Sequence, residues 1–178
     1  MMKIKYYFLA LIFLASCSDK RQYLIDQIKE KEAIVSKSYE DIPDRSTSES
    51  LRNDYLDFAQ KFPDDTLSPV FLHKSAELAL AIDMPKEAVS AIDTLQKHYP
   101  DYKFLPDAIF FKGFVLENYL KDLPAAQKTY NDFILKWPNH NLVPQVKAAI
   151  ENMGKSPEEI VKEFMERTQQ TDSLSNSF

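Results

Sequence analysis

The segment Leu95-Gln96-Lys97-His98-Tyr99-Pro100 decides the fold, because its pattern occurs three times in the chain. Each copy has a large apolar residue, three variable residues, an aromatic residue and a proline. The other copies are Phe58-Ala59-Gln60-Lys61-Phe62-Pro63 and Phe133-Ile134-Leu135-Lys136-Trp137-Pro138. The final prolines are 37 residues apart from Pro63 to Pro100, and 38 apart from Pro100 to Pro138. A period of this length indicates an array of repeated structural units.

A second proline lies six residues beyond each copy and marks the opposite boundary of the unit: Pro69, Pro106 and Pro144. Proline ends a helix that precedes it, but it is accepted in the first turn of the helix that follows. Each pair of prolines therefore predicts the end of one helix and the start of the next. Pro85 and Pro124 predict a further turn inside the units. The chain is thus expected to form antiparallel helical hairpins packed side by side.

Small residues at fixed places in the unit resemble those of the tetratricopeptide repeat. In that family, a small residue midway along the first helix meets a small residue at the start of the second. Ser75 and Gly113 match the first position, and Ala88 and Ala126, thirteen residues later in each case, match the second. A glycine inside a helix costs about 1 kcal/mol relative to alanine, so a close helix contact explains Gly113.

The resemblance covers about residues 50 to 155, and it extends to tetratricopeptide proteins of the bacterial envelope. These include the periplasmic partner of the Tol–Pal system and the lipoprotein subunit of the outer-membrane barrel assembly machine. The resemblance implies a fold rather than an activity, because one fold serves many functions. The sequence does not distinguish between these systems.

The whole sequence predicts an all-α fold: a tetratricopeptide-like α-solenoid of about eight antiparallel helices, preceded by a lipoprotein signal peptide. Only two of the 178 residues are glycine, whereas sheets and phosphate-binding loops need glycine for tight turns. The expected segments are a signal peptide at 1–16, a lipidated tether at 17–21, a helical domain at 22–168 and a disordered tail at 169–178. Within the domain, we expect repeats at about 22–66, 67–103 and 104–141, and a terminal capping hairpin at 142–168.

The two ends of the helical domain have their own signals. Apolar residues at helical spacing predict a helix from Gln22 to Tyr39, followed by a long polar turn from Glu40 to Ser50. Near the other end, a helix from Leu142 to Met153 is expected to stop at Gly154. Ser156-Pro157-Glu158-Glu159 has the pattern of a capping box that opens a last helix. Its apolar face is expected to cover the end of the stack and consists of Ile160, Val161, Phe164 and Met165.

The first seventeen residues have the layout of a secretory signal. Lys3 and Lys5 precede an apolar run from Tyr6 to Ala15. A run of about ten residues is too short to cross a bilayer. Cys17, the only cysteine, ends the sequence Leu14-Ala15-Ser16-Cys17, which resembles the bacterial lipobox. That resemblance implies acylation of Cys17 and cleavage before it, whereas an ordinary signal peptide with a free thiol is the alternative.

Several acyl chains on one residue give firm membrane attachment, so we expect an exported, lipid-anchored protein. Ser18 after the cysteine resembles the signal that permits transfer to the outer membrane, facing the periplasm. The net charge is −5, and no segment beyond the N-terminus is strongly basic. Nucleic acid is therefore not an expected partner.

The sequence contains no recognisable catalytic or cofactor-binding motif. His73, His98 and His140 are far apart in the sequence, and none has a second histidine or a cysteine within one helical turn. One histidine with one carboxylate is a weak signal for metal binding. We therefore expect no enzyme activity, no cofactor, no metal and no small-molecule substrate.

A protein-binding groove is the expected functional site, because the first helices of tetratricopeptide hairpins line a concave surface. The corresponding residues are Leu72, Ala76, Leu80, Phe110, Phe114, Glu117 and Asn118. The expected partners are other envelope proteins or peptide segments, and the expected role is that of a non-catalytic scaffold in outer-membrane assembly or maintenance. Two alternatives remain open: a subunit of an envelope enzyme or glycan-binding complex, and a structural lipoprotein that binds only itself.

Overall fold

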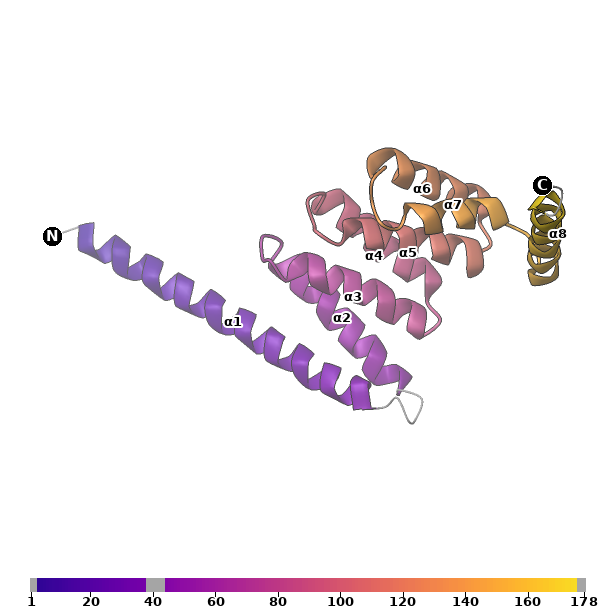
Figure 1. The fold of residues 1–178 in the computed structure, drawn as a ribbon. Helices are drawn as coiled ribbons and strands as arrows, with labels where there is room; N and C mark the ends of the chain where they lie inside the picture. The colour runs from indigo at the N-terminus through magenta and orange to yellow at the C-terminus, as the bar shows by residue number, and fades with distance from the viewer. Residues whose placement is uncertain (1–2, 38–43, 176–178) are drawn as a thin grey trace. The chain divides into compact units, whose positions relative to one another are not determined.

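A computed structural model describes the backbone of residues 3–37 and 44–175, and the side chains of residues 19–37, 44–166 and 168. Over these residues the chain forms eight helices and no strand, so the predicted all-α class is confirmed (Figure 1). The chain divides into two compact units, Met1–Ala108 and Ile109–Phe178. In the first unit each helix packs against the next, and in the second unit α6 packs against α7, which is consistent with an α-solenoid.

The first unit contains α1 (Lys3–Lys37), α2 (Arg45–Lys61), α3 (Ser68–Ala81) and α4 (Pro85–His98). Each of these helices packs against the next one along the chain. The core between α1, α2 and α3 is built from Ile25, Ile28, Leu51, Tyr55, Phe58 and Phe71. Its aromatic rings are in close contact, with ring centroids 5.2 Å apart for Tyr55 and Phe71 and 4.8 Å apart for Phe58 and Phe71.

Helix α1 differs from the predicted helix at Gln22–Tyr39 because it begins much earlier, at Lys3. The predicted tether at 17–21 therefore lies inside a helix. Arg21 is moreover bound to Asp65, with Nη2 donating to Oδ1 at 3.1 Å and Nε donating to Oδ2. This region is thus an ordered part of the unit. Residues 38–43, which include the end of the predicted helix and Pro43, lie outside the described residues.

The predicted turn at Glu40–Ser50 is wrong for its second half, because α2 begins at Arg45. Asp44 caps the helix, and its carboxylate accepts hydrogen bonds from the backbone N–H groups of Ser46 and Thr47. The hydroxyls of the same two residues also donate to Asp44. A short polar side chain before a helix satisfies amides that have no partner within the helix. The polar residues thus begin the helix and do not extend the turn.

A polar cluster joins α1, α2 and α3 at the edge of this core. Tyr55 Oη and Lys74 Nζ each donate a hydrogen bond to Glu32 Oε1, both at 2.7 Å. Burial raises the pKa of Glu32, but the hydrogen bonds from Lys74 and Tyr55 outweigh it, so that the pKa is lowered from its usual value. The carboxylate is therefore held in its charged form between three helices.

The turns after the aromatic-proline segments repeat the same backbone geometry. Phe62, Tyr99 and Trp137 end α2, α4 and α6 with φ between −131° and −128° and ψ between 60° and 62°. Each donates its backbone N–H to the residue four positions earlier. The predicted stops at these three residues are therefore confirmed, and the repeat in the sequence is a repeat in the backbone.

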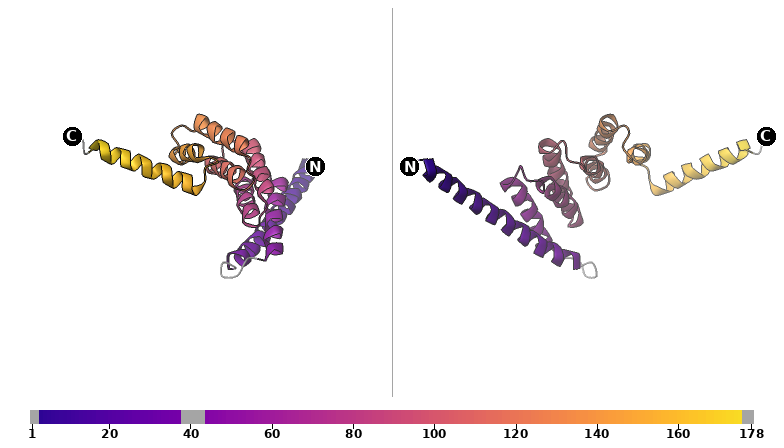
Figure 2. Two further views of the ribbon diagram at one scale, coloured as in Figure 1. Left: turned by 90° about the vertical axis from the view of Figure 1, so that its right-hand side faces the viewer. Right: turned by 60° about the vertical axis from the view of Figure 1, so that its left-hand side comes forward.

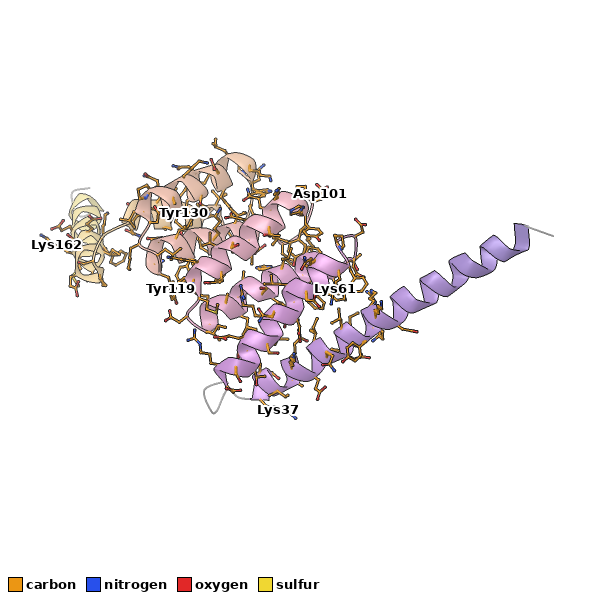
Figure 3. All side chains as sticks on the ribbon, turned by 180° about the vertical axis from the view of Figure 1, so that it is seen from behind. Lys37, Lys61, Asp101, Tyr119, Tyr130 and Lys162 are labelled. Carbon is orange, nitrogen blue, oxygen red and sulfur yellow. The ribbon has the colours of Figure 1, made fainter. Side chains whose placement is uncertain are left out.

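The second unit contains most of α5 (Leu105–Asn118), and all of α6 (Leu123–Lys136), α7 (Val143–Asn152) and α8 (Pro157–Ser175). Helices α5 and α6 meet at Gly113 and Tyr130, and Tyr130 Oη donates to Glu117 Oε2 at 3.0 Å. Figure 3 shows Tyr130 among the helices of this unit. The predicted close helix contact at Gly113 is confirmed, although the nearest atoms belong to Tyr130 and not to Ala126.

The signals predicted around the last two helices are confirmed. Gly154 has φ of 77°, a left-handed conformation that favours glycine after a helix. Ser156 Oγ accepts from the backbone N–H of Glu159 at 3.2 Å, and the Glu159 carboxylate accepts from the backbone N–H of Ser156 at 2.7 Å. These reciprocal bonds make the predicted capping box, and they fix where α8 begins.

The segment predicted as a terminal capping hairpin, 142–168, contains two helices, α7 and α8, and α8 is drawn in yellow in Figure 2. The apolar face of α8 is not covered. Its apolar residues remain at the surface: Phe164 is 71% exposed and Met165 is 58% exposed. Ile160 and Val161 are exposed as well. The helix also continues to Ser175, because no proline or glycine interrupts the predicted tail from Gln169. The last three residues of that tail, 176–178, lie outside the described residues.

Candidate protein-binding surfaces

The α3 part of the predicted groove is mostly inaccessible. Ala76 is fully buried, and Leu72 is only 3% exposed. Leu80 is half-buried. Helix packing covers Ala76, which therefore does not line an open groove, whereas Leu72 is nearly covered but still lines the hollow described below. Being apolar and at helical spacing, they are part of the core.

The α5 part of the predicted groove lies in the second unit. Phe110 is half-buried and packs against Tyr130, with ring centroids 6.0 Å apart. Glu117 is the acceptor for the Tyr130 hydroxyl and so supports the core. Phe114 and Asn118 are exposed, and the Asn118 side chain donates to the Phe114 carbonyl at 3.0 Å. Of the four predicted groove residues on α5, Phe114 and Asn118 are therefore exposed, whereas Phe110 and Glu117 contact Tyr130.

A hollow in the first unit is the strongest candidate binding surface. Its volume is about 590 Å³, and it lies between α2 and α4. Ala59, Leu72 and Ala91 form an apolar floor, and each of them is less than a tenth exposed. The rims are polar and consist of Arg52, Gln60, Asp64, Glu87, Ser90, Thr94 and His98. Ala59 on α2 and Ala91 on α4 have small side chains, so they leave a space that larger side chains would fill.

Two residues that line this hollow, Tyr99 and Arg52, differ in their hydrogen bonding. Tyr99 lines one end, where its hydroxyl donates to the Pro63 carbonyl at 2.8 Å. Arg52 lines another part of the rim, and its Nε is buried with no hydrogen-bond partner among the described residues. A buried donor without an acceptor costs free energy, and Nη1 of the same side chain donates to Asn53 Oδ1 at 3.3 Å. An apolar floor between polar rims suits a polypeptide segment with both kinds of side chain.

Sequence reasoning missed this hollow because it assigned the site to the first helix of each hairpin. The hollow lies mainly on α2 and α4, the helices that end at the aromatic-proline segments, and Leu72 of α3 is the predicted groove residue that lines it. A signal was present in the small residues Ala59 and Ala91 beside polar Gln60, Ser90 and Thr94. Helices with small residues at one face leave room between neighbours, but the alignment of those faces follows only from packing.

A second hollow lies at the start of the described side chains. It has a volume of about 800 Å³ and is lined by Asp19, Lys20, Tyr23 and Leu24 of α1, by Lys61 of α2 and by Phe62. Tyr23 is 63% exposed. Lys61 pairs with Asp57 at 2.7 Å; its position is labelled in Figure 3. Arg21, between the lining residues, pairs with Asp65. This hollow therefore combines the rings of Tyr23 and Phe62 with paired charges. Its first lining residue, Asp19, is two positions after Cys17, whose side chain lies outside the described residues.

The three histidines are placed as separate surface or packing residues. The Nε2 atom of His73 is 3.9 Å from the Glu77 carboxylate, and His98 lines the hollow between α2 and α4. His140 Nδ1 accepts from the backbone N–H of Leu142 at 3.3 Å. Among the described residues, no group of three or more His, Cys, Asp and Glu side chains is arranged to hold a metal ion.

Comparison with other proteins gives no further guide to the site. Neither a family model nor a curated protein matches the chain. Within the described part of the chain, no helix has the length and apolar character needed to cross a membrane.

Proposed function

We propose that the protein is an exported, lipid-anchored scaffold of tetratricopeptide type that binds other envelope proteins and has no catalytic activity. The observation that carries the proposal is the hollow between α2 and α4. Its floor is apolar, and its rims present both charged and hydroxyl groups. These features favour a partner segment that buries apolar side chains in the floor and presents polar groups to the rims.

The repeated backbone supports the tetratricopeptide part of the proposal. The aromatic-proline stops, the recurring turn hydrogen bonds and the small residues at helix contacts all follow one period. Ser75, Ala88 and Ala126 are fully buried, as expected of residues that allow neighbouring helices to approach closely. The anchor is supported by the sequence Leu14-Ala15-Ser16-Cys17 after an apolar run.

A site-specific crosslinking experiment in cells tests the proposed binding surface. A photoreactive amino acid at Thr94, an exposed residue of the hollow, is compared with the same group at Gln96, which is exposed on α4 but does not line the hollow. We expect one defined envelope protein to be captured from Thr94 and not from Gln96. Equal capture from both positions, or capture from neither, would contradict the proposal.

Light scattering distinguishes the scaffold from a structural lipoprotein that binds only itself. The proposed scaffold is expected to be monomeric in the absence of its partner. A stable homo-oligomer, together with crosslinks from Thr94 only to a second copy of the chain, would instead favour self-association.

A further inference from the structure

The hollow beside Tyr23 and Phe62 lies close to the proposed acylation site. Tyr23 follows Cys17 by six residues, which corresponds to about 9 Å along a helix. Both residues belong to α1. If the acyl chains of Cys17 are in the membrane, the hollow must lie within a short distance of the bilayer surface.

The part of α1 that follows Cys17 is fixed to the rest of the first unit. Arg21 forms two hydrogen bonds with Asp65 in the turn between α2 and α3. This pairing lowers the pKa of Asp65, chiefly through the Arg21 side-chain hydrogen bond, so the carboxylate remains charged. Ile25 and Ile28, one and two turns later, are buried in the core. The anchor therefore holds a folded surface near the membrane, and not the end of a free tether.

The chemistry of this surface matches the interface between lipid and water. Tyrosine and other aromatic side chains favour this zone, where one end of the ring is apolar and the other is hydrated. Lysines at the edge can cover apolar surface with their stems and keep the ammonium group in water. Lys20 lies next to Asp19, and Lys61 is paired with Asp57, so the local charges balance. Binding is therefore expected to depend on the aromatic rings more than on anionic lipid.

We propose that the surface formed by Lys20, Tyr23, Leu24, Lys61 and Phe62 rests in the interfacial region of the membrane that carries Cys17. This inference rests on the proposed acylation of Cys17. The occupant of the hollow is phospholipid, whose upper acyl chains and headgroups contact Tyr23 and Phe62. The membrane thus fixes the orientation of the first unit as well as its location.

The test uses the mature acylated protein, which begins at Cys17, in phosphatidylcholine vesicles whose acyl chains carry bromine, which quenches nearby tryptophan. The single native tryptophan is removed by Trp137→Phe, and a reporter is introduced by Tyr23→Trp. The matched control is Ile34→Trp, because Ile34 is exposed on the same helix and lies about 16 Å further along it. A second reporter, Lys20→Trp, lies in the same hollow and is used if the first variant is unstable.

We expect bromine to remove most of the emission from the Tyr23→Trp and Lys20→Trp variants and to leave that of the Ile34→Trp variant unchanged. Mass spectrometry and vesicle flotation report acylation and anchoring independently. Anchored, acylated protein with no difference between the reporters overturns the membrane surface but leaves the anchor intact. Failure of acylation and flotation removes the anchor itself. Emission that changes with the protein-to-lipid ratio but not with bromine indicates a second copy on this surface, and it also overturns the proposal.

Discussion

A Cβ atom added to Gly113 would lie 2.2 Å from Cε1 of Tyr130, far inside the contact distance of two carbon atoms. The Tyr130 ring thus occupies the space that a side chain at position 113 would need. The equivalent residues one period earlier are Ser75 and Ile92, and both are fully buried. The two repeats therefore differ at these positions: glycine and tyrosine occupy them in one repeat, and serine and the smaller isoleucine occupy them in the other.

This pairing predicts that Gly113→Ser destabilises the second unit by about 1–3 kcal/mol, because the added atoms overpack the contact with Tyr130. Adding Tyr130→Ile recreates the pair of the preceding repeat, so the double variant is expected to be more stable than the sum of the single changes predicts. Chemical denaturation measures all four free energies of unfolding. Tyr130→Phe is the matched control: it keeps the ring and should give no rescue, and rescue by it would refute the steric explanation.

The charge on Glu32 is predicted to stabilise the first unit only above acidic pH. Because the folded state lowers the pKa of Glu32 below its usual value of 4.5, the stabilisation is present above that value and is lost as pH falls through the folded pKa. Glu32→Gln should therefore cost about 1 kcal/mol near neutral pH and much less in strong acid. Urea denaturation over a pH series checks this, with Glu30→Gln, an exposed residue of the same helix, as control. A cost independent of pH would contradict the electrostatic explanation.

The exposed face of α8 predicts that its apolar residues contribute little to folding of the isolated chain. Phe164→Ser should change the free energy of unfolding by less than about 0.5 kcal/mol, as is usual for surface substitutions. Val146 on α7 is fully buried, so Val146→Ala is expected to cost about 1–3 kcal/mol. Thermal denaturation of the two variants compares them directly. A large loss of stability in Phe164→Ser would show that α8 packs as a cap in solution.

The proposed lipid anchor predicts a clear effect of replacing Cys17. Cys17→Ala should leave the helical content unchanged, abolish labelling by an alkyne-bearing fatty acid and release the processed protein from membranes. Cell fractionation, with the chain length measured to establish that the signal segment has been cleaved, provides the measurement. Persistence of the cleaved variant in the membrane fraction would contradict attachment through this residue.

The sequence predicted best those features that depend on local backbone chemistry. Proline excludes the helix before it, so Pro63, Pro100 and Pro138 located the helix ends. Gly154 and the Ser156–Glu159 box are equally local, and both lie where the pattern indicated. Asp44 is also a local cap, but it was missed because the polar residues after it resemble those of a turn.

Features that depend on packing partners could not be read from the pattern. An apolar stripe on α8 indicates a face that can be buried, but it does not say whether anything covers it. Leu72 and Ala76 likewise fit a groove and a core equally well, and only the packed structure assigns them to the core. The hollow between α2 and α4 is lined by two small residues, Ala59 and Ala91, which are 32 positions apart in the sequence and lie at the same hollow only in the folded chain.

The matching backbone angles of Phe62, Tyr99 and Trp137 give the chain a standard junction. If a gene segment encoding one period were duplicated or deleted between two such turns, the turn at the new join would keep the same backbone angles and hydrogen bonds. The number of hairpins is therefore free to change without redesign of any interior contact other than those at the new join. Evolution or protein engineering can therefore change the length of such a protein by whole helical hairpins.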